Sequence, residues 1–222
     1  MIVRVKEASG NGASQSQAVI GGTDDDSYTG MYALLTAEAK TGYRPRILAV
    51  PDYDTEEVTS QLCVIAQNLR ALFMPVVTAA RPWRRLLLIA KPSLTRELML
   101  IWPDFIAYNP LTDDNETFPA PAYACGLRAA IDNSQGWHKS LSNVVVNNVL
   151  GISKDVFWAL QAEDSDANRA EQQRNPQRLS SVTVSASRGN RTTDTETYTF
   201  EVFTRTAQIL ADSIAGGAIY LC

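Results

Sequence analysis

RILAVPDYDTEEVTSQLCVIAQNL, from Arg46 to Leu69, joins an apolar run directly to a helical repeat. The first six residues are apolar at nearly consecutive positions, which is typical of a strand buried on both faces of a parallel sheet. Asp54 then predicts the start of a helix, with Glu57 three residues later in the position of a capping box. Apolar residues recur at alternating steps of four and three, and they predict one buried helical face: Val58, Leu62, Ile65, Leu69 and Leu72.

The same two patterns recur on both sides of this stretch. LMLIWP, at 98–103, is a second continuous apolar run, and the opening MIVRVK alternates apolar and polar residues as a short strand does. Helical patterns recur at 30–40, 120–131 and 154–161. Buried strands that alternate with amphipathic helices predict an α/β fold, with a mixed or largely parallel sheet flanked by helices.

The composition is that of an ordinary globular protein. The 222 residues are 45% hydrophobic and 20% charged, enough for one good-sized domain or two small ones. The net charge of −4 argues against a nucleic-acid-binding protein, which needs a basic face. Because no run of about 18 apolar residues occurs, we expect no membrane-spanning helix. Cys63, Cys125 and Cys222 have no metal-ligand spacing, so they are predicted to be free thiols in a reducing compartment.

Acidic residues follow both apolar runs and offer one candidate site. Asp52 and Asp104 are placed at the carboxyl ends of parallel strands, the edge where open α/β sheets bind ligands, and Asp24, Asp25 and Asp26 add further carboxylates. One hypothesis is a Mg²⁺-dependent phosphoryl-transfer enzyme. The other is that Pro-Asp begins a turn and that aspartate caps a helix. The second is favoured because no lysine or nucleophile spacing accompanies the carboxylates, so we assign no catalytic, cofactor-binding or metal-binding residue.

The only histidine of the chain lies in QGWHKSLSN, at 135–143. His138 stands close in sequence to Ser140 and Ser142, which suggests a base beside nucleophiles. However, the chain has no G-x-S-x-G turn, and a histidine and a serine two residues apart seldom face each other productively. Trp137 is expected to be a packing anchor. We therefore predict a structural or subunit-contact role for this stretch.

GWHKSLSNVVVNNVLGISKDVFWALQ resembles the tail sheath proteins of contractile-tailed bacteriophages. Further segments resemble the same family in the same order: VIGGTDDDSYTGMYALL, YRPRILAVPDYDT, RELMLIWPDFIAYNP, PAPAYACGLRAAID and FEVFTRTAQILADSIA. Together they cover most of the chain. The resemblance therefore implies the central part of a tail sheath protein over residues 1–222, with the α/β core of that family.

The resemblance also implies a structural role. Subunits of this family surround the tail tube in stacked rings, and contraction of the sheath drives the tube through the host envelope. The implied partners are other sheath subunits in a helical homo-oligomeric lattice, the tail tube protein, the baseplate and the tail terminator, with no nucleic acid and no membrane. The implied location is the virion tail, after assembly in the host bacterial cytoplasm. The family carries no catalytic site, so no catalytic residue is transferred to this chain.

Three segments depart from the family: 75–95, 168–189 and 216–222. The second is polar and weakly patterned, and the first has three prolines where a parallel crossover needs a helix. Codons can be chosen for RPWRRLLLIAKPSLT such that a shift of one base gives KTVEEAIAYRETFVN, an amphipathic helix similar to the family. Similar shifts give family-like residues in the other two segments. We interpret them as frame errors in a defective prophage gene or in its sequencing, and we expect the chain to be truncated at both ends relative to the family.

Overall fold

Parallel strands form the centre of the computed structural model, which describes residues 2–5, 7, 12–24, 27–75, 96–142, 144–156, 179–183, 186–188 and 200–219. The sheet strands are β3 (Ile47–Leu48), β4 (Leu72–Phe73), β5 (Leu100–Trp102), β9 (Leu179–Thr183) and β10 (Ala186–Arg188). β3 pairs with β4 and β5 pairs with β9, both in parallel, and β10 returns antiparallel to β9. A parallel bridge between Phe73 and Leu98 joins the two groups. This mixed, largely parallel sheet confirms the predicted fold class.

Helices cover both faces of this sheet, as its alternating side chains require. Phe73, Leu98 and Leu100 pack in one apolar cluster with α3 (Glu56–Leu69). Met99 and Ile101, between them in sequence, pack in the other cluster with α5 (Ala120–Ser134). Every residue of LMLIWP is apolar because both faces of this strand are buried.

Helix α3 follows the predicted stripe but begins and ends differently. The N-cap is Thr55, whose hydroxyl accepts a hydrogen bond from the Val58 N–H, and not Asp54 one residue earlier. The helix ends at Leu69 because Arg70 adopts a left-handed conformation, with φ of 50°. Leu72 therefore lies in β4 and packs against the α5 side of the sheet. Apolar spacing alone could not detect this reversal of direction.

The remaining predicted elements have mixed outcomes. The helix at 120–131 is confirmed as α5, with proline in its first turn. The helix at 30–40 is a 3-10 helix, η1 (Gly30–Thr36), that continues as the short α2 (Ala37–Thr41). Residues 2–5 form no strand, although the partly buried Val5 packs against the core. The helix predicted at 154–161 lies largely outside the described residues.

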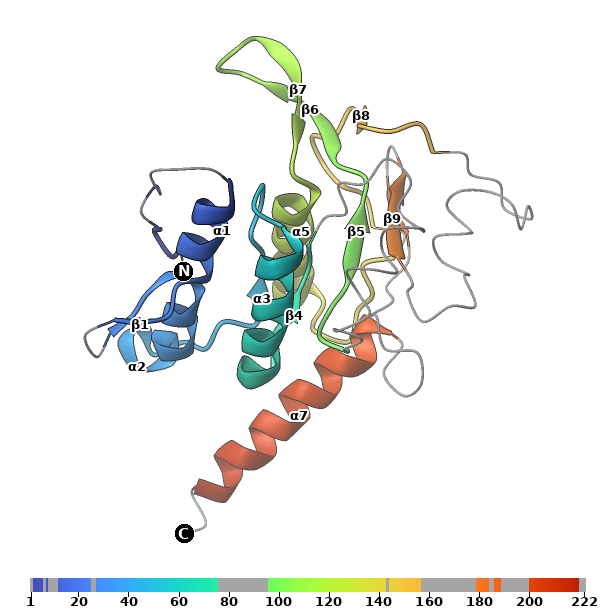
Figure 1. Cartoon of the computed structure of the whole chain (residues 1–222). Coiled ribbons are helices and arrows are strands. Elements are labelled where there is room, and N and C mark those ends of the chain that lie inside the picture. The colour runs from blue at the N-terminus through green and yellow to red at the C-terminus, as the bar shows by residue number, and fades with distance from the viewer. Residues whose placement is uncertain are drawn as a thin grey trace.

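The other elements extend from this core (Figure 1). Helix α1 (Gly12–Ile20) and the hairpin of β1 (Thr23–Asp24) and β2 (Ser27–Tyr28) lie on the α3 side. A longer antiparallel hairpin, β6 (Phe105–Asn109) with β7 (Asp114–Phe118), projects at the top of the view, and β8 (Gly151–Ile152) pairs with β6. The long helix α7 (Glu201–Ile219) runs away from the sheet at the bottom. Among the described helices, none is both long and apolar enough to cross a membrane.

The three atypical segments lie mostly outside the described residues. The exceptions are Pro75, 179–183 and 186–188, together with 216–219 at the end of α7. The backbone of 179–183 continues the parallel sheet as β9, opposite 100–102 of β5. The interpretation of these segments as frame errors remains a prediction, and resequencing of the gene is its direct test.

Candidate functional site

Helix α7 presents a polar face to the core. Glu201, Thr204, Arg205 and Gln208 are all buried, with at most 6% of each residue exposed. At about 100° of rotation per residue these four side chains fall on one face of the helix. A helix that packs on a core normally buries apolar residues, so this face needs charge compensation from its neighbours.

That compensation comes from a network that we call the Glu201 cluster: Arg128 and Asp132 of α5 with Glu201 and Arg205 of α7. Arg128 Nη1 lies 3.0 Å from Glu201 Oε1, and Arg128 Nη2 lies 2.8 Å from Asp132 Oδ1. Arg205 forms an ion pair with Asp132 and lies 3.5 Å from Glu201 Oε1. Two guanidinium groups thus face two carboxyl groups, and their charges offset each other when Glu201 is ionised. The cluster fixes α7 to α5 and leaves little freedom in their relative orientation.

The segment QGWHKSLSN completes this cluster. Arg128 donates a hydrogen bond of 2.7 Å to the Lys139 carbonyl, and the Arg205 guanidinium carbon lies 4.5 Å from the centre of the Trp137 ring. The Trp137 ring therefore contributes a cation–π contact in addition to packing. His138 is exposed, and among the described residues no hydrogen bond joins it to Ser140 or Ser142. This arrangement agrees with the structural role predicted for the segment.

Burial dominates the electrostatics of the Glu201 carboxyl. Desolvation raises its pKa to about 7, against the opposing effect of Arg128 and Arg205, which stabilise the carboxylate. Burial likewise lowers the pKa of Arg205. Both shifts have the same physical cause, because a charged group loses hydration when it leaves water.

We expect the stability of the protein to depend on Glu201 near neutral pH. The folded carboxyl binds its proton more tightly than the unfolded one, so its contribution is complete below the unfolded pKa and is lost as pH rises toward 7. The loss approaches about 1.4 kcal/mol per pH unit within this window. Urea unfolding from pH 5 to 8 should give a steeper decline for the natural protein than for Glu201→Gln, which cannot titrate. Parallel pH profiles of the two proteins would contradict this assignment.

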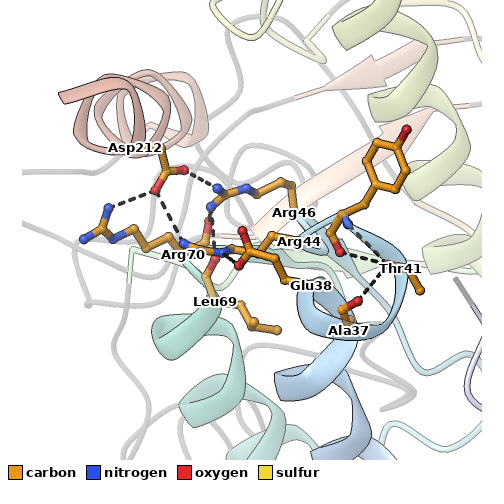
Figure 2. A network of polar contacts seen from close by, with 9 residues as sticks. Ala37, Glu38, Thr41, Arg44, Arg46, Leu69, Arg70 and Asp212 are labelled. Atoms are coloured by element: carbon orange, nitrogen blue, oxygen red, sulfur yellow. Dashed lines mark hydrogen bonds and ion pairs between the residues drawn. The ribbon is translucent and has the colours of Figure 1, made fainter. Parts of the chain in front are cut away.

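A second network, the Asp212 cluster, holds α7 further along its length (Figure 2). Asp212 pairs with Arg46 and lies 2.9 Å from Arg70 Nη1 and 3.7 Å from Arg44 Nη1. Arg44 also binds Glu38 at 2.7 Å. These side chains are partly exposed, so each pair contributes about 0–1 kcal/mol. The cluster therefore orients α7 over β3 and α3 more than it stabilises the fold.

The acidic residues predicted at the sheet edge do come together in part. Asp52 and Asp104 line one hollow of about 310 Å³, while Asp24 lies in the separate hairpin of β1, and Asp25 and Asp26 lie outside the described residues.

Their local bonding is that of a turn and a cap. Asp52 has a left-handed backbone with φ of 68°, and Asp104 Oδ1 accepts a hydrogen bond of 3.0 Å from the Ala120 N–H at the start of α5. Burial raises the pKa of Asp104, and Asp52 adds to this effect. Within the ranges described above, no three His, Cys, Asp or Glu side chains are grouped so that they could hold a metal ion.

The cysteines agree with the predicted free thiols as far as they are described. Cys63 is buried and Cys125 is partly buried, and neither forms a disulfide. Burial raises the pKa of the Cys125 thiol to about 12, so that it stays protonated and unreactive at neutral pH. Cys222 lies outside the described residues.

The sequence pattern alone predicted neither of the two ion networks. Glu201 and Arg205 are four residues apart, the spacing of a helical ion pair, but this spacing is common on solvated helix faces. The stronger signal was the contrast between the polar residues 201, 205, 208 and 212 and the apolar residues 203, 210 and 214 of the same helix. It predicts a two-faced helix without saying which face is buried.

Solved structures with a similar fold come from contractile injection systems. The chain superimposes with a TM-score of 0.60 on the PVC sheath complex of an extracellular contractile injection system in its contracted state, at 14% identity, covering 95% of this chain and 58% of that one. The contracted helical sheath of the anti-feeding prophage gives a TM-score of 0.56 at 16% identity, covering 91% of this chain and 59% of that one. At these identities the likeness establishes the fold.

Proteins related in sequence share a higher identity with this chain than these structures do. The chain is 58% identical over 224 residues to the major tail sheath protein of Serratia phage KSP20, covering 97% of this chain and 55% of that protein. It is 41% identical over 228 residues to the tail sheath protein of Escherichia phage P2, covering 97% of this chain and 56% of that one. The chain thus spans about half the length of these relatives. Both relatives are named as tail sheath proteins, which confirms the expectation of a structural protein and not an enzyme.

The match to a protein family agrees with the similar structures and with the sequence relatives. Residues 26–189 match the model of the phage tail sheath protein central domain, a range that contains the central sheet, α3, α5 and the β6–β7 hairpin. The chain therefore belongs to the phage tail sheath protein family.

Proposed function

We propose that this chain acts as the central part of a structural subunit in a contractile phage tail sheath. In this role the subunit surrounds the tail tube, and its rearrangement with neighbouring subunits drives the tube through the host envelope. The observation that carries the proposal is the 58% identity to a major tail sheath protein along 97% of this chain.

The architecture supports a mechanical role. The sheet is buried between two apolar clusters, and the Glu201 and Asp212 clusters tie α7 to α5, β3 and α3. A close-packed core of this kind resists deformation and transmits strain. A subunit with such a core can change its lattice position as a rigid body, which is one of the known ways in which assemblies switch.

The partners that we propose are other sheath subunits, the tail tube protein, the baseplate and the tail terminator. The proposed location is the virion tail, after assembly in the host bacterial cytoplasm. We further propose that the gene is a defective prophage remnant, because the sequence pattern of segments 75–95, 168–189 and 216–222 departs from the one expected of the family.

A chimera tests this function. The matching stretch of the KSP20 sheath protein is replaced by this chain, and a second chimera keeps the relative's own residues opposite 75–95, 168–189 and 216–222. Electron microscopy of the induced particles is expected to show sheathed tails, some of them contracted, for the second chimera. Sheathed tails from the second chimera and bare tubes from the first would support both the sheath function and the frame disruption. Bare tubes from both chimeras would contradict the function.

A further inference from the structure

We propose that Arg44, Arg46 and Arg70 form a binding site for a phosphate dianion, and that Asp212 of α7 occupies this site as an internal competitor. These three guanidinium groups are called the arginine cradle below. A phosphate that displaces Asp212 releases the end of α7 from the core. The inference goes beyond the proposed function and does not depend on it.

Three arginines of the cradle converge on one carboxylate (Figure 2). Arg44 and Arg46 belong to the segment that enters β3, and Arg70 follows the last residue of α3. Asp212 Oδ1 lies 2.9 Å from Arg70 Nη1 and 3.7 Å from Arg44 Nη1, while Asp212 Oδ2 pairs with Arg46. A carboxylate offers these donors a single charge and two oxygens, whereas a phosphate offers up to two charges and at least three acceptor oxygens. Three guanidinium groups therefore suit a phosphate better than one carboxylate.

Two guanidinium groups of the cradle are held in place by bonds that do not involve α7. Arg46 Nη1 donates hydrogen bonds of 3.0 Å and 3.4 Å to the Leu69 and Arg70 carbonyls at the end of α3. Arg44 Nε lies 2.7 Å from Glu38 Oε2. These groups therefore keep their positions when the carboxylate of α7 leaves. A site that is formed before its ligand arrives loses little entropy on binding.

The positive charge of the cradle exceeds the negative charge around it. Three arginines face two carboxylates, those of Asp212 and Glu38, which leaves an excess of one positive charge. Burial lowers the pKa of Arg46 in spite of the opposing effect of Asp212, because the guanidinium group has lost hydration. An anion that carries a second charge offsets this loss more fully than the carboxylate does.

A ligand can reach the cradle from solvent. Arg44 and Arg70 keep 34% and 44% of their side chains exposed. Arg44 and Arg46 also line a hollow of about 920 Å³ beside β3, together with the exposed Tyr43. A hollow of this size can hold the organic group of a small phosphate monoester. The ligand is therefore a phosphate dianion, either free or as a monoester.

The end of α7 depends on Asp212 for its contact with the core. The buried residues of α7 end at Gln208, and residues 209–214 are exposed or partly buried. The ion pairs of Asp212 lie within this second part. Displacement of Asp212 by phosphate is therefore expected to free residues 209–214, while the Glu201 cluster continues to hold the start of the helix.

Calorimetric titration with inorganic phosphate tests the site, at about pH 8, where phosphate is mainly a dianion, and at an ionic strength kept constant with sodium chloride. We expect Asp212→Asn to bind phosphate about tenfold more tightly than the natural chain, because the competing carboxylate is gone. Addition of Arg46→Gln to Asp212→Asn should abolish this binding. Glu97→Gln is the matched control, since it removes a carboxylate paired with one arginine, Arg96, and should bind phosphate like the natural chain. Titration with phenyl phosphate separates the two sources, because only a monoester site binds it more tightly than inorganic phosphate.

Hydrogen exchange of the natural chain follows α7, and saturating phosphate is expected to speed amide exchange at residues 209–214. Thermal melting of each variant verifies the fold, and Asp212→Ser replaces Asp212→Asn if the latter unfolds. An Asp212→Asn variant that binds phosphate no more tightly than the natural chain, or equally well with Arg46→Gln added, would overturn the site. Exchange that saturating phosphate leaves unchanged would overturn the release of α7. The sheath function fails separately, through bare tubes in the chimera experiment.

Discussion

Replacement of Arg128 with alanine is expected to lower the free energy of unfolding by roughly 3–5 kcal/mol. Arg128 is fully buried and binds Glu201, Asp132 and the Lys139 carbonyl. Above the raised pKa of Glu201, about 7, alanine leaves the buried Glu201 carboxylate and the partly buried Asp132 carboxylate with one cation, Arg205, between them. The cost is the uncompensated charge, because the hydration lost on folding is no longer offset by an ion pair.

Urea unfolding measures this loss, with Arg44→Ala as the matched control. Arg44 is about one-third exposed and pairs with Glu38 and Asp212, so its removal is expected to cost no more than about 1 kcal/mol. A double variant, Arg128→Met with Glu201→Leu, removes opposite charges together. Its loss of unfolding free energy should be smaller than the sum of the losses of Arg128→Met and Glu201→Leu made singly. An Arg128→Ala loss no larger than that of Arg44→Ala would show that the Glu201 cluster does not hold α7.

Replacement of Phe73 with alanine is expected to destabilise the fold by roughly 3–5 kcal/mol. Phe73 is fully buried in β4, where its ring packs in the cluster of α3 and β5 while its backbone bonds to both sides of the 97–99 segment. The change removes a large apolar surface and leaves a cavity that the surrounding sheet and helix cannot fill.

Phe203→Ala is the matched control, since it makes the same chemical change on a 56% exposed ring. That ring contacts Phe200 edge to face, with 5.5 Å between the ring centres, so its loss should cost about 0.5–1.5 kcal/mol. Urea midpoints of the two variants compare them directly. Equal losses would mean that β4 is not the centre of the core, and would contradict the sheet order described here.

The sequence predicted those elements whose signal is local. The continuous runs at 46–51 and 98–103 indicated buried strands, and the spacing of Val58, Leu62, Ile65 and Leu69 indicated one helical face. The same reasoning failed at Leu72, because the turn at Arg70 is set by backbone conformation and not by side-chain period. It failed at residues 2–5 because an alternating segment becomes a strand only when a neighbouring edge supplies hydrogen bonds.

By itself, the sequence determined the α/β class, the helix that covers one face of the sheet, and a resemblance to tail sheath proteins that the relatives confirmed. These features follow from apolar periodicity and from long ordered matches. Only the tertiary structure decided which face of α7 is buried and which charges meet. Arg128 and Glu201 are 73 residues apart, and no local pattern predicts their contact. A charged face is buried in preference to an apolar one only where opposite charges converge from other elements, since the cost of desolvation must be offset in three dimensions.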